Sequence, residues 1–287
     1  MDDIFSVLKE RVGTFSKGQR RIAQYINDNY DKAAFMTAKC LGETVGVSES
    51  TVVRFASELG FDGYPSMQKA MQDHLMNRLT SVQRIGVAND RIGKQDVLSM
   101  VLQSDMEKLR RTEETVNRED FRAAVQAILD AKRIFVMGVR SASPLAMFLG
   151  YYLNYMFDNV HIITTSGASE MFEQMVGVGS GDVVIAFSFP RYSAAVVKGA
   201  EYCRTTGATV SGVTDQVLSP LGQNCDRVLI AKSDMVSLVD SLVAPFSVVN
   251  ALIVSLASAR EETLSKRFET LERVWEEYNV YEKRADK

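Results

Sequence analysis

The stretch Leu41–Tyr64, with the sequence LGETVGVSESTVVRFASELGFDGY, predicts two short helices joined by a tight turn. Leu41 and Val45 are apolar at i, i+4 spacing, so they share one face of the first helix. Gly46 follows them, and glycine permits the left-handed conformation that often ends a helix. Ser48 is then placed to cap the second helix, because its hydroxyl can accept a hydrogen bond from an unpaired amide of the first turn.

The second predicted helix has one apolar face and one polar face. The apolar face consists of Val52, Phe55, Ala56 and Leu59, and the residues facing away are Glu49, Ser50, Thr51, Val53 and Arg54. This is the pattern of a helix-turn-helix, whose second helix enters the major groove of DNA. Arginine can bond a guanine bidentately, and hydroxyls can contact bases or phosphates. An ordinary pair of packed helices has the same apolar spacing, so the helix pair alone leaves both interpretations open.

The residues around this helix favour DNA binding. The run VSESTVVRF, followed by LGFDGY, resembles the recognition helix and its exit in the RpiR family of bacterial transcription regulators. Upstream, Phe15–Ala23 (FSKGQRRIA) resembles the entry to that family's first helix. The resemblance implies sequence-specific binding to a double-stranded DNA operator. The expected DNA contacts are Ser48, Ser50, Thr51, Arg54, Lys17 and Arg20.

The charge composition limits how the chain could bind DNA. The chain has 287 residues, 46% hydrophobic and 24% charged, which predicts two ordinary globular domains. The formal net charge is −3, and Met1–Arg84 holds eleven Lys and Arg against ten Asp and Glu, a formal +1. A positive DNA-binding surface must therefore come from the local placement of basic side chains rather than from bulk charge.

The sequence predicts a cytoplasmic protein without a metal centre, a cofactor or a membrane span. Three widely spaced cysteines and two histidines argue against a disulfide framework or a zinc site. The start, MDDIFSVLKE, lacks the basic residues and long apolar run of a signal peptide. The apolar run Ser237–Ala259 is interrupted by Asp240, Pro245 and Asn250, which favours a buried or dimer-facing helix over a transmembrane one.

From Arg133 onward the pattern changes to alternating strands and helices. Short apolar runs predict strands at Arg133–Val139, Val160–Thr164, Asp182–Phe187, Thr209–Thr214 and Arg227–Ala231. Helices are expected between them at 144–157, 169–175 and 194–206. This order predicts a three-layer α/β domain with a five-stranded parallel sheet, which binds ligands beyond the carboxyl ends of its strands.

The expected layout is an all-α helix-turn-helix domain at 1–80, a polar linker at 81–95 and a ligand-binding domain with flanking helices at 96–287. Within the first domain, further helices are predicted at 4–14, 17–30 and 65–79. In the second, Asp96 and Asn117 are expected to cap two helices. A closing helix at 259–281 has an amphipathic stripe of Leu264, Phe268, Leu271 and Trp275.

Three strand-to-helix loops carry polar or basic residues that suit an anion. Hydroxyls, amides and helix N-termini can donate to a phosphate, and arginine adds charge. The candidate ligand-binding residues are Arg140, Ser141, Ser143, Ser188, Arg191, Tyr192, Ser193 and Thr214. Each serine could instead cap its own helix. The prediction of a ligand site therefore rests on three such loops meeting at one edge of the sheet.

Residues 133–259 resemble the sugar isomerase (SIS) domain, a phosphosugar-binding fold, and the run Thr214–Leu229 is similar to that family's fourth-strand exit. With the N-terminal motif, this is the two-domain plan of RpiR-type regulators, which implies a phosphorylated sugar that tunes DNA affinity. Two loops depart from the family pattern. The usual GxGxS is GVRSA at 138–142, and the usual SxSGxT is SFPRYS at 188–193. An anionic ligand is still expected.

The sequence favours a ligand-responsive regulator of carbohydrate metabolism, a homodimer or homotetramer that reads a palindromic operator. The alternative is a sugar-phosphate isomerase-like enzyme with an appended helix-turn-helix domain. Isomerisation needs a general base and often a histidine, but His161 is expected in the core and Glu170 and Glu173 in solvent, so no catalytic residue is assigned. A structural DNA-bridging protein would leave the ligand loops without a use.

Overall fold

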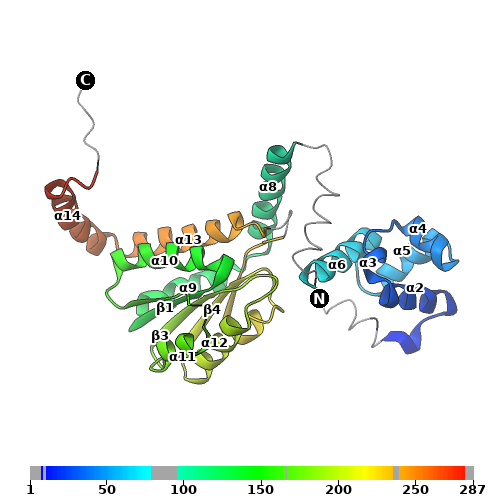
Figure 1. Ribbon diagram of the computed structural model, residues 1–287, viewed down its shortest axis with the longest axis horizontal. Coiled ribbons are helices and arrows are strands. Elements are labelled where there is room, and N and C mark those ends of the chain that lie inside the picture. Colours follow the sequence, from blue (N-terminus) through cyan, green and yellow to red (C-terminus); the bar gives the residue numbers. More distant parts are fainter. Residues whose placement is uncertain (1–7, 9–10, 79–95, 166, 235–238, 282–287) are drawn as a thin grey trace. The chain divides into compact units, whose positions relative to one another are not determined.

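The structure is a computed structural model that describes Leu8 and residues 11–78, 96–165, 167–234 and 239–281. These residues form two compact units (Figure 1). The first contains the described residues up to 78 and Val239, and the second contains the other described residues from 96 onward. The predicted linker, 81–95, lies outside the described residues. So does most of the helix predicted at 4–14, of which Val12–Thr14 forms a 3₁₀ turn.

The first unit is helical throughout its described residues. Its helices are α2 (Lys17–Asp28), α3 (Tyr30–Ala33), α4 (Ala38–Val45), α5 (Glu49–Glu58) and α6 (Gly63–Arg78). The helix predicted at 17–30 ends earlier, because Asn29 leaves the helical region (φ −136°, ψ 42°) and separates α2 from α3. The apolar faces meet in one core, whose fully buried members include Ile22, Ile26, Leu41, Phe55 and Met67.

The second unit begins with two helices capped as predicted. The Asp96 carboxylate accepts from the amide of Leu98 at the start of α8 (Val97–Thr115). The Asn117 side chain accepts from the amides of Glu119 and Asp120 at the start of α9 (Arg118–Asp130). Both caps satisfy backbone donors that have no partner within their own helix.

The predicted parallel sheet is confirmed. Its strands are β1 (Arg133–Gly138), β2 (Val160–Ile163), β3 (Asp182–Phe187), β4 (Thr209–Thr214) and β5 (Arg227–Ile230), in the order β2-β1-β3-β4-β5. Every neighbouring pair is parallel. The register sets Gly138 opposite Phe187, so the loops after β1 and β3 leave the same edge side by side.

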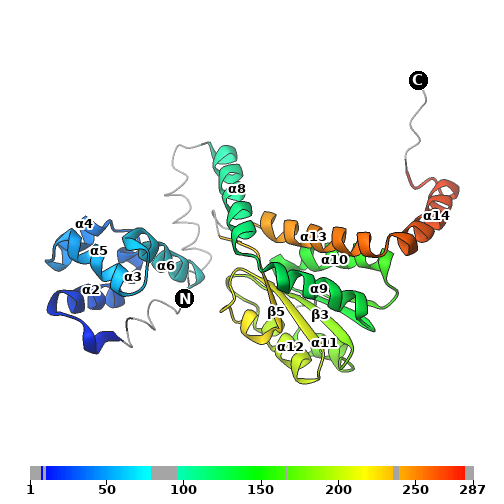
Figure 2. The same ribbon diagram turned by 180° about the vertical axis from the view of Figure 1, so that it is seen from behind.

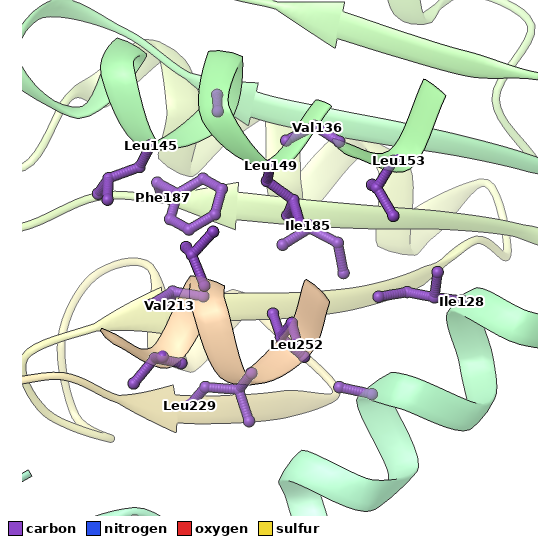
Figure 3. Packing of buried hydrophobic residues seen from close by; sticks show 14 of the residues in the cluster. Ile128, Val136, Leu145, Leu149, Leu153, Ile185, Phe187, Val213, Leu229 and Leu252 are labelled. Atoms are coloured by element: carbon purple, nitrogen blue, oxygen red, sulfur yellow. The ribbon is translucent and has the colours of Figure 1, made fainter. Parts of the chain in front are cut away.

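Helices cover both faces of the sheet and complete the predicted three layers (Figures 1 and 2). On one face, α9, α10 (Ser143–Met156) and α13 (Val243–Ala259) enclose a core that includes Leu149, Ile185 and Leu252 (Figure 3). On the other face, α11 (Ala168–Met175) and α12 (Ala194–Thr205) pack over Met137 and Val184. The central strands β1 and β3 are buried and almost wholly apolar, which is typical of a parallel sheet covered on both sides.

The last helix, α14 (Glu261–Glu277), has no buried residue, and its predicted apolar stripe is only half-buried. Arg267 attaches it to the end of α10 by donating to the carbonyl oxygen of Tyr155 (3.2 Å) and pairing with Asp158. Among the described residues no single helix is long and apolar enough to cross a membrane. Only α13 and α14 taken together reach that length and composition, and they are bent by 95° at their junction.

Candidate DNA-binding surface and ligand-binding edge

The turn between α4 and α5 fixes where α5 begins. Gly46 is left-handed (φ 70°) and ends α4 as predicted. The amide of Val47 donates to the carbonyl oxygen of Gly42 (2.9 Å), and a Cβ at Gly42 would lie only 2.9 Å from the Val47 carbonyl oxygen. The turn is therefore tight enough to require a glycine there. Ser48 caps α5 as predicted, accepting from the amide of Thr51 (3.3 Å).

The orientation of α5 agrees with the sequence pattern. Val52 and Phe55 are fully buried, whereas Ser50, Val53 and Arg54 are exposed. Phe55 packs edge-on against Phe15, with ring centroids 5.3 Å apart. The helix is therefore anchored by its apolar face, and its polar face is turned away from the core.

Two of the predicted DNA contacts also hold the local fold together. The Ser48 hydroxyl lies within hydrogen-bond distance of the hydroxyls of Ser50 (2.9 Å) and Thr51 (2.8 Å), in addition to its capping bond. Thr51 is half-buried, and a Cβ built at Gly18 would lie 3.9 Å from its methyl group. Ser48 thus positions the two hydroxyls that follow it, while Ser50 remains exposed.

Helix α2 brings basic residues to the same surface. Arg20 donates to the carbonyl oxygen of Phe15 (2.9 Å) and shares a depression of about 510 Å³ with Thr51 and Arg54. Lys17 is exposed in the first turn of α2 but does not line that depression. Of the two residues of α2 among the predicted DNA contacts, Arg20 therefore lies beside α5.

A capping box at the start of α2 was not predicted, although its sequence signal is present. The Ser16 hydroxyl accepts from the amide of Gln19, and the Gln19 side-chain oxygen accepts from the amide of Ser16 (2.8 Å). The Gln19 side chain also donates to Glu58 at the end of α5. The spacing Ser-x-x-Gln is the signature of this motif. The Gln19–Glu58 hydrogen bond ties α2 to α5.

The predicted ligand residues lie along the carboxyl edge of the sheet. After β1, a 3₁₀ turn (Arg140–Ala142) leads directly into α10, with Arg140 and Ser141 exposed and Ser143 half-buried. After β3, the loop places its residues at different depths. Ser188 is buried, Tyr192 and Ser193 are half-buried, and Arg191 is exposed.

Capping does not account for the serines of these loops. The N-cap of α10 is Ala142, which has no side-chain hydrogen bond. Ser193 occupies the N-cap of α12, but its hydroxyl makes no capping bond. Its amide instead donates to the Ser188 hydroxyl (3.2 Å). Both helix starts therefore lack a side-chain cap. At α10 the Ser143 amide donates to the carbonyl oxygen of Arg140 and Pro144 has no amide proton, so α12 offers the more open set of first-turn amides to an anion.

In the loop after β4, the predicted ligand residue Thr214 lies below the surface. Thr214 is fully buried, and its hydroxyl lies 3.1 Å from Ser219 Oγ and 3.2 Å from Asp215 Oδ1. The sequence did not single out Asp215, which accepts from the Tyr192 hydroxyl (2.8 Å). Burial raises the pKa of the Asp215 carboxyl. Burial, and then the nearby Asp215 charge, raise the pKa of Tyr192. Thr214 thus orients the loop after β4, and Asp215 joins this loop to the loop after β3.

Lys232, just after β5, connects this edge to α8. Its ammonium donates to the carbonyl oxygen of Asp215 (2.9 Å), and its amide donates to the hydroxyl of Thr112 on α8 (2.9 Å). Arg111 of α8 pairs with Asp234 (2.5 Å). Arg111 and Thr112 could not be found from apolar periodicity, because they lie on the face of α8 that the hydrophobic pattern leaves unassigned.

The same face of α8 holds a buried lysine. Lys108 is 2% exposed and donates to the hydroxyl of Ser104 (2.6 Å). Burial lowers its pKa. Nearby, the Ser241 hydroxyl donates to Asp105 (2.6 Å). The interface between α8 and the residues after β5 is therefore largely polar.

His161 was expected in the core, and this was wrong. It lies on the edge strand β2, is exposed, and stacks on Phe135 with ring centroids 4.7 Å apart. An edge strand leaves one side of its residues uncovered, which the alternation of the sequence alone does not reveal. Among the described residues, no cluster of His, Cys, Asp or Glu could hold a metal ion.

The helical unit and the parallel α/β unit define a helix-turn-helix protein with an attached sugar-isomerase-type domain. The model of the helix-turn-helix domain of the rpiR family matches residues 3–78, and the SIS domain model matches residues 127–255. The chain belongs to the RpiR family of transcriptional regulators.

The chain is similar to a curated regulator and to solved structures of this fold. The chain is 21% identical over 216 residues to the HTH-type transcriptional regulator HexR of Pseudomonas aeruginosa, covering 75% of this chain and 74% of HexR. The sugar isomerase domain of an RpiR transcription factor from Sphaerobacter thermophilus is 27% identical with a TM-score of 0.60, covering 62% of this chain and 99% of that one. The Vibrio vulnificus NanR protein complexed with ManNAc-6P is 23% identical with a TM-score of 0.58, covering 94% and 97%.

Proposed function

We propose that this chain regulates transcription of genes for carbohydrate metabolism and that an anionic, phosphosugar-like effector sets its affinity for DNA. The observation that carries the proposal is the presence of two distinct surfaces in one chain. One is the exposed polar face of α5, and the other is a sheet edge with two uncapped helix starts and two arginines. That NanR is complexed with a phosphosugar supports the class of effector.

In the first unit, α5 enters the major groove. Ser50 and Arg54 lie on its exposed face and contact base edges or phosphates, and Arg20 and Lys17 contact the backbone from α2. Ser48 acts mainly by holding the hydroxyls of Ser50 and Thr51 in place. A homodimer or homotetramer presents two such helices to the halves of a palindromic operator.

In the second unit, the effector binds over the loops after β1 and β3. The proposed signal passes from Tyr192 to Asp215, from Asp215 to Lys232, and from Lys232 to Thr112 on α8. These are hydrogen bonds between polar groups, which can exchange partners when a ligand closes on the loops. Helix α8 is the first described element after the gap at 79–95, so its movement alters the presentation of the DNA-binding unit.

The test measures operator affinity with and without effector. Genomic fragments retained by the protein supply the operator, and a thermal-shift screen over sugar phosphates and related acids supplies the ligand. We expect a saturating ligand to change operator affinity by about 5- to 150-fold, the usual range of allosteric coupling. Equal affinities in the two conditions would contradict the proposal.

An isomerase remains the second candidate, because Asp215 and Tyr192 form a hydrogen-bonded acid pair at the ligand edge. A carboxylate with a raised pKa can act as a general base. We propose binding without turnover. Proton exchange between a bound sugar phosphate and deuterated water, lost in Asp215→Asn, would favour the enzyme instead.

A further inference from the structure

Two arginines at the ligand edge have a backbone conformation that favours glycine. Among the described residues other than glycine, φ is positive at Arg140 (55°), Arg191 (63°) and Asn279 (50°). A Cβ makes this left-handed region unfavourable, and asparagine tolerates it better than arginine does. Arginine therefore stands at two positions where glycine would fold more easily, and such outliers point to a role for the side chain.

These two arginines occupy equivalent places in adjacent loops. β1 and β3 are neighbours, with Gly138 opposite Phe187, and Arg140 and Arg191 follow those two residues by two and four positions. Neighbouring strands lie about 4.8 Å apart, so the two loops leave the edge together. Both arginines are exposed, and each precedes a helix start without a side-chain cap.

The two arginines lie in different loops, and each stands before its own helix start without a side-chain cap. Their guanidiniums can therefore meet two different anionic groups of one ligand. We propose that this site takes a ligand with two separate anionic groups, a phosphate and either a second phosphate or a carboxylate, each bound by one arginine. The inference rests on the proposed function and specifies the effector class of the same site.

The test compares matched ligands by isothermal titration of the full chain. One pair is glucitol 6-phosphate and 6-phosphogluconate, both open-chain, which differ at C1 by a hydroxymethyl group and a carboxylate. The other pair is fructose 6-phosphate and fructose 1,6-bisphosphate, which differ by a phosphate. We expect the two-anion member of one pair to bind at least about tenfold more tightly, the effect of one charge-assisted hydrogen-bonded pair. The responding pair identifies the second anion.

Glycine variants separate a ligand role from a structural one. Arg140→Gly and Arg191→Gly relieve the left-handed strain, so the unliganded protein should be as stable as the parent or more so. One variant should weaken the binding of both ligands of the responding pair. The other variant should abolish only the preference for the ligand with the second anion. Asn279→Gly, the matched control, changes the same kind of backbone away from the edge and should leave both affinities unchanged.

The outcomes distinguish failure of this inference from failure of the proposed function. If monophosphates bind as tightly as their two-anion partners, or if both arginine variants keep the preference, this inference is wrong and the proposed function stands. If none of the four compounds binds and the thermal-shift screen yields a ligand with a single anionic group, this inference is wrong and the proposed function stands; if the screen yields no anionic ligand at all, both fail.

Discussion

The face of α5 and the carboxyl edge of the sheet present polar groups in opposite ways. On α5, a regular helix is held by buried apolar residues such as Val52 and Phe55, and its polar side chains project from it. At the sheet edge, polar groups lie on irregular loops and bond to one another, as Tyr192 does to Asp215. A side chain that projects from α5 as Arg54 does can be removed without disturbing the fold, whereas changes at the sheet edge spread to their partners.

The largest effect should follow from removing the anchor of α5. Phe55→Ala deletes a fully buried ring and should reduce the free energy of unfolding of the first unit by about 3 to 5 kcal/mol. Chemical denaturation monitored by circular dichroism measures the change. If the first unit unfolds at the parent denaturant concentration, α5 is not anchored as described.

Arg54→Ala tests the opposite case, a side chain that projects from the fold. Because Arg54 is exposed, the variant should remain folded but lose about 1 to 3 kcal/mol of operator affinity. Fluorescence anisotropy with labelled operator gives the affinity. Lys69→Ala removes an exposed cation from α6 in the same unit and should change the affinity much less. Equal affinities for Arg54→Ala and the parent protein would refute the assignment of α5 as the reading helix.

The sequence predicted the structure of α5 more completely than that of the sheet edge, for a physical reason. The caps at Ser48, Asp96 and Asn117 and the apolar faces of the helices depend on residues a few positions apart, so local spacing determines them. The strands were also found, because covered parallel strands are continuous apolar runs. Elements of this kind account for nearly all of the described fold.

The loops depend on contacts between distant residues. Nothing near Asp215 in the sequence shows that the Tyr192 hydroxyl donates to it. Nor does the sequence show that Lys232 contacts both Asp215 and Thr112, although Lys232 and Thr112 are 120 positions apart. The buried position of Thr214 and the exposure of His161 likewise follow from the tertiary arrangement. The candidate ligand residues could therefore be assigned to one edge of the sheet, but their hydrogen-bond partners could not.

Thr112→Val tests whether the edge and α8 act together. The substitution keeps the shape of a buried side chain but leaves the amide of Lys232 without its acceptor, which should reduce stability by about 1 to 2 kcal/mol. It should also reduce the effect of the effector on operator affinity. Thr115→Val on the same helix, whose hydroxyl bonds only to its own turn, is the control. A coupling equal to that of the parent protein would exclude this route.

The smallest effect should be a change in the dependence of stability on pH. Because burial raises the pKa of Asp215 in the folded protein, folding favours the protonated carboxyl. The stabilisation is complete below the unfolded pKa of about 3.9 and is lost as the pH rises through the folded pKa. Asp215→Asn removes this titration while keeping an oxygen that can accept from Tyr192. The variant should therefore lose less stability than the parent between pH 4 and the folded pKa, as measured by denaturation at a series of pH values. Parallel pH profiles for the two proteins would mean that Asp215 is as well solvated in the folded state as in the unfolded chain, and the edge would then resemble the exposed face of α5.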